Sequence, residues 1–251
     1  MELGIEGRVA LVMAASQGIG RGIAAALARE GTRVAVVSRS RERIEEVAAA
    51  LGGDAAGFEG DTSDLERMRE LPGEVAARLG EPATILVLNT GGPPQAGPLE
   101  SSIEDWEAAF RSLVLAPRVL IEAALPAMRE RGFGRIVNVG SSSTREPIAD
   151  LTLSNSLRLA AVGFLKTLSR EVAGDGITVN TVATGRFATE RLASNWGGWE
   201  EMERGAAADV PAGRLGTPEE YGDLVAFLCS ERAGYLTGGV IPLDGGLVRS
   251  V

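Results

Sequence analysis

The feature that most constrains the fold is the regular alternation of short apolar runs with longer stretches of helical periodicity. The first cycle reads RVALVM at 8–13, GIGRGIAAALAREG at 18–31 and RVAVVS at 33–38. Short apolar runs suit strands buried on both faces, and the helices between them suit crossovers between parallel strands. Further runs typical of strands lie at 55–61, 84–89, 135–140, 177–183 and 240–244. We therefore predict an α/β fold with a doubly wound, seven-stranded parallel sheet and helices on both faces.

Helical patterns also run through residues 41–53, 64–79, 103–131, 152–173 and 217–231. No repeat, linker or low-complexity tract divides the chain, so we predict one domain over 1–251. The irregular stretch 186–216 carries Trp196 and Trp199, two of the three tryptophans. Long segments of this kind are often lids, which predicts a substrate lid here. The alternative is a surface excursion whose tryptophans pack on the body of the protein.

The composition excludes several functions. A net charge of -9 opposes binding to nucleic acid or to an anionic membrane surface. The charged start MELGIEGR and the lack of a long apolar segment predict a soluble, cytoplasmic protein. The chain has no histidine, so a Ser-His-Asp triad is excluded and a metal site is not expected. Its lone cysteine, Cys229, lies in an apolar run and suits packing.

The turn after the first strand, MAASQGIG, has the features of a dinucleotide site. Gly18 and Gly20 precede a helix, where backbone amides attract a pyrophosphate and glycines allow close approach. At the end of the second strand stands Arg39, which suits the 2'-phosphate of NADP, whereas NAD favours an acidic residue there. We therefore predict NADP in preference to NAD. The alternatives are that the glycines serve packing only and that Arg39 and Arg41 begin a solvated helix.

Along its whole length the chain resembles the short-chain dehydrogenase/reductase family, and most of all its 3-oxoacyl-ACP reductases. The matching stretches are MAASQGIG, GDTSD, LVLNTGG, GRIVNVGSSS, GITVNTVATGRFATER and RLGTPEEYGDLVAFLCSERAGYLTGGVIPLDGG. The resemblance implies a single-domain Rossmann fold, usually assembled as a homotetramer. The chain departs from the family pattern at Ala14, which stands where the family has a turn glycine. It also departs at Leu88, in the LVLNTGG stretch, and at Thr184, just before Gly185.

The resemblance also implies where a dinucleotide binds. Asp61 faces the adenine, Asn89 and Gly91 line the adenosine end, and Gly185 and Thr189 hold the nicotinamide. The full set of implied cofactor-binding residues is Ala14, Ser16, Gln17, Gly18, Ile19, Gly20, Arg39, Asp61, Thr62, Asn89, Thr90, Gly91, Gly185 and Thr189.

The family's catalytic Asn, Ser, Tyr and Lys fall, by position, on Leu113, Ser141, Ser154 and Arg158. Only the serine is retained. An aliphatic hydroxyl is a poor general acid, and a guanidinium gives up no proton near neutral pH. Four residues apart, Ser154 and Arg158 share one helical face, so both can face one pocket. The alternative is that they merely cap and solvate the helix.

These observations leave two main functional hypotheses. The first is a divergent NAD(P)(H)-dependent oxidoreductase acting on a small-molecule carbonyl or alcohol, apolar or acyl in character, with Ser141, Ser154 and Arg158 in the catalytic site. The second is a catalytically inactive nucleotide sensor or partner subunit with the same fold. A purely structural role is disfavoured by the retained Gly18, Gly20, Asp61 and Asn89.

Overall fold

Seven parallel strands form one sheet in the structure, a computed structural model that describes residues 2–250. The strand order is β3-β2-β1-β4-β5-β6-β7, with the chain reversing direction across the sheet between β3 and β4. The strands are β1 (Val9–Met13), β2 (Arg33–Ser38), β3 (Ala56–Glu59), β4 (Ala83–Leu88), β5 (Gly134–Val139), β6 (Ile177–Thr184) and β7 (Val240–Leu243). This order and the parallel pairing confirm the predicted doubly wound sheet.

The helices lie close to their predicted positions, with two differences. The stretch expected as one helix over 103–131 contains a π-helical segment, η1, and the irregular stretch 186–216 contains two helices, α7 and α8. The helical elements are α1 (Gly18–Arg29), α2 (Arg41–Leu51), α3 (Leu65–Leu79), α4 (Ile103–Phe110), η1 (Arg111–Leu115), α5 (Ala116–Glu130), η2 (Ser142–Thr144), α6 (Thr152–Val172), η3 (Ala173–Asp175), α7 (Glu190–Asn195), α8 (Trp199–Ala208) and α9 (Pro218–Leu228). Among residues 2–250, no helix is long and apolar enough to cross a bilayer.

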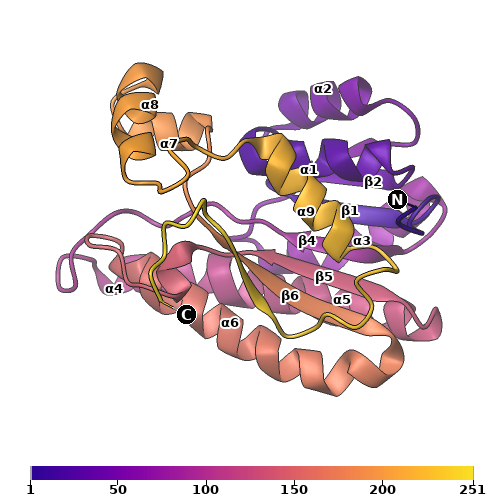
Figure 1. Cartoon of the computed structure of the whole chain (residues 1–251). Helices are drawn as coiled ribbons and strands as arrows, with labels where there is room; N and C mark the ends of the chain where they lie inside the picture. Colours follow the sequence, from indigo (N-terminus) through magenta and orange to yellow (C-terminus); the bar gives the residue numbers. More distant parts are fainter. Residues whose placement is uncertain (1, 251) are drawn as a thin grey trace.

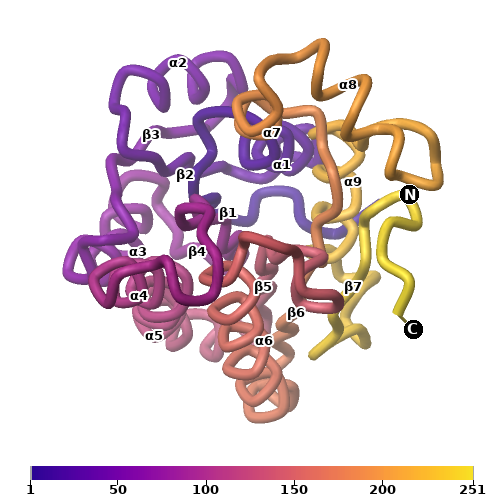
Figure 2. Tube along the Cα trace, turned by 90° about the vertical axis from the view of Figure 1, so that its left-hand side faces the viewer, coloured from indigo at the N-terminus to yellow at the C-terminus, as the bar shows by residue number. Residues whose placement is uncertain are grey.

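The helices cover both faces of the sheet (Figure 1). In the turned view the strand labels run from β3 to β7, with α1, α2 and α9 on one side and α3 to α6 on the other (Figure 2). Each face has its own apolar core: one joins the sheet to α1 and α9, and the other joins it to α3, α5 and α6. Cys229 is fully buried in the first core, in keeping with a packing role.

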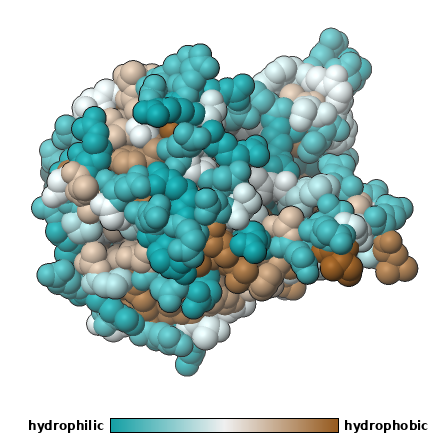
Figure 3. Space-filling view, turned by 180° about the vertical axis from the view of Figure 1, so that it is seen from behind, coloured by the Kyte–Doolittle hydropathy of each residue, from teal (hydrophilic) through white to brown (hydrophobic). Residues whose placement is uncertain are grey.

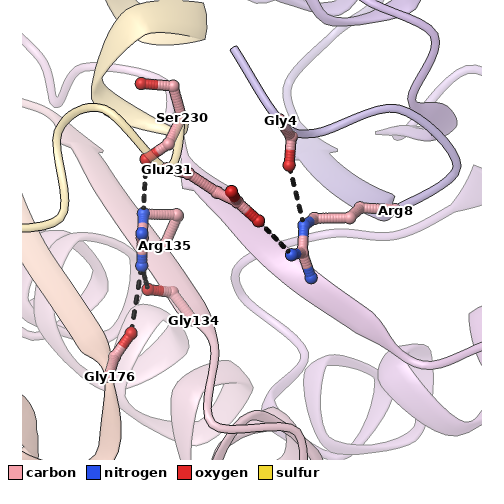
Figure 4. Close-up of polar contacts among 7 residues, drawn as sticks. All are labelled: Gly4, Arg8, Gly134, Arg135, Gly176, Ser230 and Glu231. Carbon is pink, nitrogen blue, oxygen red and sulfur yellow. Dashed lines mark hydrogen bonds and ion pairs between the residues drawn. The ribbon is translucent and has the colours of Figure 1, made fainter.

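A buried arginine joins β5 to two neighbouring segments at the amino end of the strand. The Arg135 guanidinium donates to the carbonyls of Ser230 at 2.9 Å and Gly176 at 3.0 Å (Figure 4). Nearby, Arg8 pairs with Glu231 at 2.9 Å. These contacts lie at the edge of the sheet opposite the carboxyl ends of the strands, so they stabilise the scaffold and leave the other edge free for a site.

The turn between β1 and α1 contains a strained residue. Ala14 has φ +48°, a left-handed conformation that side chains with a Cβ disfavour. The strain is local, because the adjacent Ala15 is buried and does not have a positive φ.

We predict that Ala14→Gly raises the free energy of unfolding by up to about 1 kcal/mol. Relief of left-handed strain, about 1–2 kcal/mol, exceeds the cost of glycine's extra freedom in the unfolded chain, about 0.5–1 kcal/mol. Urea denaturation of the two proteins measures the difference. The matched control is Ala15→Gly, which we expect to destabilise the fold. Equal destabilisation by both changes would contradict the strain argument.

Candidate functional site

A cavity of about 960 Å³ lies at the carboxyl ends of β1, β2 and β4. Its lining contains every predicted cofactor-binding residue except Gly185: Ala14, Ser16, Gln17, Gly18, Ile19, Gly20, Arg39, Asp61, Thr62, Asn89, Thr90, Gly91 and Thr189. The carboxyl ends of parallel strands meet at one edge of the sheet, so segments far apart in the sequence come together here.

The glycine turn presents uncapped amides to this cavity. α1 begins at Gly18 itself, whereas the sequence suggested that both glycines precede the helix, and its N-cap Gln17 makes no side-chain cap hydrogen bond. The first amides of a helix have no intrahelical partner, so they remain available to an anion. Gly20 packs directly against the Ala14 carbonyl, and Asn89 Nδ2 donates to that carbonyl at 3.4 Å. Gly20 is therefore required for packing, while the uncapped start of α1 fits a pyrophosphate.

Two arginines lie at the end of the cavity next to β2. Arg39 is exposed and lines the cavity, and Arg43, in the first turn of α2, also lines it. Arg43 Nη1 donates to Gln17 Oε1 at 3.2 Å, and its backbone amide is capped by Ser40 Oγ at 3.4 Å. Sequence reasoning missed Arg43, because Arg39 lies before α2 and helical spacing does not relate the two residues. The pair fits a phosphate group.

The polar residues that were predicted to face the adenosine of a dinucleotide bond within the protein. Asp61 Oδ1 accepts from the Ser63 amide at 2.9 Å. Thr62 Oγ1 lies 2.7 Å from Ser112 Oγ, which connects the loop after β3 to η1. These contacts hold the floor of the cavity in place.

Ser154 and Arg158 touch one another beside the end of β5. Arg158 Nε donates to Ser154 Oγ at 3.2 Å, and Nη1 donates to the carbonyls of Val139 at 2.8 Å and Gly140 at 3.4 Å. Desolvation, followed by the positive charge of Arg191, lowers the pKa of the Arg158 guanidinium to about 10. Even so, Arg158 is overwhelmingly charged at neutral pH. The structure thus places a fixed positive charge where Ser154 and Arg158 meet. Because both side chains are hydrogen-bonded inside the protein, the alternative that they only cap and solvate the helix is disfavoured.

Ser141 lies directly after β5, with its side chain at the start of η2. Its Oγ accepts from the Ser143 amide at 3.1 Å, and its carbonyl accepts from Thr144 Oγ1 at 2.7 Å. Ser141, Ser154 and Arg158 are not among the residues that line the large cavity. They lie around the end of β5, outside that lining.

Leu113 lies in the π-helical segment and packs in an apolar cluster. It is buried with Ala109, Leu153 and Leu157, and Trp106 packs against them. π-Helical turns are frequent at functional sites because they redirect a side chain. Here the redirected side chain is apolar, and it also reaches the cavity lining.

A buried tyrosine, Tyr221, lies near Arg158, although its place in the C-terminal part of the sequence predicted no role for it in the site. Tyr221 Oη is 2.8 Å from Thr184 Oγ1, and its ring meets Phe187 edge-on with centroids 5.0 Å apart. Burial raises the pKa of this phenol well above its usual range, although the hydrogen bond with Thr184 and the Arg158 charge oppose the shift. The phenol is fully buried, so it is unsuited to release a proton to a substrate.

The segment 186–216 lies over the same edge of the sheet. Thr189 Oγ1 caps α7 by accepting from the Leu192 amide at 3.3 Å. Trp196 is half-buried, with the Arg186 guanidinium 5.4 Å from its ring, whereas Trp199 is exposed. Trp196 packs within the segment itself, in a cluster with Ala193, Met202 and Ala206, so neither tryptophan packs on the body of the protein as the alternative expected. The lid stays a prediction.

Gly185 lies outside the cavity lining, at the end of β6. Its amide donates to the Leu243 carbonyl at 3.0 Å, and a Cβ at this position would collide with Asp244. Glycine is required here because β6 and the segment after β7 approach closely.

Comparison with known proteins agrees with this geometry. A family model described as Enoyl-(Acyl carrier protein) reductase matches residues 13–248. The 3-oxoacyl-[acyl-carrier-protein] reductase FabG of Haemophilus influenzae is 35% identical over 248 residues, which cover 98% of this chain and 100% of the relative.

Two solved structures share the fold over almost the whole chain. L-sorbose reductase from Gluconobacter frateurii, complexed with NADPH and L-sorbose, has a TM-score of 0.94 and 31% identity, covering 100% of both chains. YwfH, an NADPH-dependent reductase involved in bacilysin biosynthesis, has a TM-score of 0.92 and 30% identity, covering 98% of this chain and 100% of its own. The chain therefore belongs to the short-chain dehydrogenase/reductase family.

Proposed function

We propose that this chain is an NADP(H)-dependent oxidoreductase that interconverts a small carbonyl compound and its alcohol. The observation that carries the proposal is the large cavity, which joins the uncapped start of α1 to Arg39 and Arg43. Ser141 and Arg158 lie outside its lining, at the end of β5. Both solved relatives described above have NADPH in their names, which supports this cofactor. When bound, NADPH supplies the hydride.

In this proposal the residues of the chain bind and polarise the substrate, and water supplies the proton. Ser141 Oγ orients the carbonyl, and the Arg158 guanidinium stabilises the negative charge that develops on its oxygen. The guanidinium is held rigidly by Ser154 and the Val139 carbonyl, so its charge needs no reorganisation. It cannot serve as the proton donor, because it stays charged near neutral pH. General acid catalysis is typically worth about 10²- to 10⁴-fold, so we expect slow turnover.

A second candidate function is a dinucleotide sensor without turnover. It is favoured by the position of the Tyr221 phenol, which is buried against Thr184 and cannot replace the missing acid. Both functions predict dinucleotide binding, and only the first predicts reduction.

We further propose that the protein assembles as a homotetramer, as the family resemblance implies. Large exposed apolar side chains occur on α4 and α6, at Ile103, Phe110 and Leu159, and just before α4 at Leu99. α4 packs beside α6, and Figure 3 shows apolar surface gathered along the lower part of the molecule. Exposed apolar surface of this kind marks protein interfaces.

The central test measures binding and turnover separately. We expect protein fluorescence titration to detect NADPH binding, and a panel of ketones, aldehydes and alcohols to reveal slow turnover that falls in Ser141→Ala. Binding of NADPH with no turnover across the panel would reject the oxidoreductase and leave the sensor. Absence of NADPH binding would reject both.

Cofactor preference is tested at Arg39. We expect Arg39→Ala to weaken NADPH binding by about tenfold or more and to leave NADH binding nearly unchanged, because hydrogen bonds to a charged group contribute about 1.5–3 kcal/mol. The matched control is Arg41→Ala, since Arg41 pairs with Glu45 at 3.0 Å and does not line the large cavity. Equal loss for NADPH and NADH would contradict recognition of a 2'-phosphate.

Restoring an acid should speed the reaction. We expect the double change Ser154→Tyr with Arg158→Lys to raise kcat by about 10²- to 10⁴-fold, because a phenol beside an ammonium can donate a proton. Leu113 is left unchanged, since an amide in its apolar cluster costs about 1–3 kcal/mol. Ser156→Tyr, at an exposed position of α6, is the control. No gain in kcat would show that a missing proton donor does not limit the rate.

A further inference from the structure

A second arginine lies in the segment 186–216, close enough to Arg158 for its charge to act on that guanidinium. Arg191 belongs to α7 and lines the large cavity. Its guanidinium packs against Gly92, in the loop after β4, where any Cβ would collide with it. The side chain thus spans the cavity from α7 to the loop after β4, and the glycine at 92 makes that position possible.

The Arg191 guanidinium has no protein partner in the part of the chain that the structure describes. No side-chain hydrogen bond or ion pair joins it to residues 2–250. Desolvation lowers the pKa of Arg191, and its charge acts in turn on Arg158. Two like charges that act on each other are unfavourable unless an anion joins them, and the Arg191 side chain is exposed and therefore accessible to such an anion.

Three carboxylates line the cavity, those of Asp61, Asp105 and Glu190, and none of them pairs with Arg191 among the described residues. Asp105 accepts from the Ser102 amide at 3.1 Å and from Ser102 Oγ at 2.9 Å in a capping box. Glu190 Oε2 lies beside Gly18, 3.7 Å from the place that a Cβ would occupy there. Neither forms an ion pair with Arg191, so the positive charge remains open to a ligand.

We propose that Arg191 recognises a carboxylate of the substrate, with the positive field of Arg158 behind it. The inference deepens the proposed reductase function by naming its substrates as oxo acids. The carbonyl lies toward Ser141 and Arg158, and the carboxylate lies toward Arg191. A guanidinium suits this role because it offers a planar fork of donors that matches a carboxylate.

The test uses hexanoate and hexanamide, an unreactive pair of similar shape, titrated by calorimetry into the protein saturated with NADP⁺. We expect hexanoate to bind more tightly than hexanamide. In Arg191→Met the affinity for hexanoate should fall by about ten- to a hundredfold, with hexanamide unchanged. Arg191→Lys should restore part of the loss, because it keeps the charge without the fork.

Two further variants distinguish recognition of the hexanoate carboxylate by Arg191 from a general effect of the protein's positive charge. Gly92→Ala should reproduce the loss of hexanoate affinity, since its Cβ displaces the Arg191 guanidinium. Arg204→Met removes a charge from the neighbouring helix α8, where Arg204 pairs with Glu200 at 2.9 Å, and should change nothing. Equal binding of hexanoate and hexanamide would overturn the proposal. So would an Arg191→Met protein that loses NADP⁺ affinity but not hexanoate affinity, which would assign Arg191 to the cofactor's pyrophosphate.

The same variants distinguish this site from the reductase activity itself. We expect 4-oxohexanoate to be reduced with a higher kcat/KM than its methyl ester, and Arg191→Met to remove that preference. A protein that binds hexanoate through Arg191 but reduces neither compound retains the carboxylate site and loses the proposed reductase function. A preference for the methyl ester would contradict the carboxylate site while leaving a reductase of acyl compounds.

Discussion

Parallel pairing of all seven strands is the constraint on which the site depends. It brings the carboxyl ends of β1, β2 and β4 to one edge, so that the cavity forms from segments that are distant in the sequence. It also leaves the start of α1 pointing at that edge without a side-chain cap. The opposite edge is fastened by Arg135, whose hydrogen bonds join β5 to the segments after α9 and before β6. One edge is therefore held by the protein's own contacts, while the other presents donors to a ligand.

The sequence was sufficient for the elements that depend on local pattern. Apolar runs predicted all seven strands, and the glycine turn and Arg39 were correctly expected to lie together at one edge. The sequence did not reveal which side chains from distant segments meet in the folded protein. Arg43 joins the cavity only because α2 starts beside it, and Arg191 reaches Gly92 from a segment that the sequence showed as irregular. The π-helical turn at Leu113 has no signature in helical periodicity, since apolar spacing continues through it.

The electrostatics of the site follow from the kind of cation it contains. An ammonium beside a phenol makes a proton available by lowering the phenol's pKa, whereas a guanidinium contributes only a fixed charge and donors. Burial lowers the pKa of Arg158 to about 10, which still leaves it charged at neutral pH. The site can therefore stabilise negative charge but has no side chain placed to deliver a proton. The proposed reductase chemistry, in which an anion develops on the substrate and water supplies the proton, is compatible with this charge.

The contacts around the replaced positions argue that the site has been rebuilt and has not simply decayed. Loss of function without compensation would leave buried polar groups unpaired, at a cost of about 1–3 kcal/mol each. Here Arg158 bonds to Ser154 and to two carbonyls, and Leu113 packs with Leu153 and Leu157, side chains from the helix that carries Ser154. Tyr221, likewise buried, is paired with Thr184. The changes are mutually compatible: an apolar side chain at 113 needs no polar partner, and the arginine takes its hydrogen bonds from the serine and the end of β5. Such agreement between neighbouring substitutions is what both proposed functions, the reductase and the sensor, require, and the buried Ser143 Oγ is the polar atom of this loop that remains unpaired among the described residues.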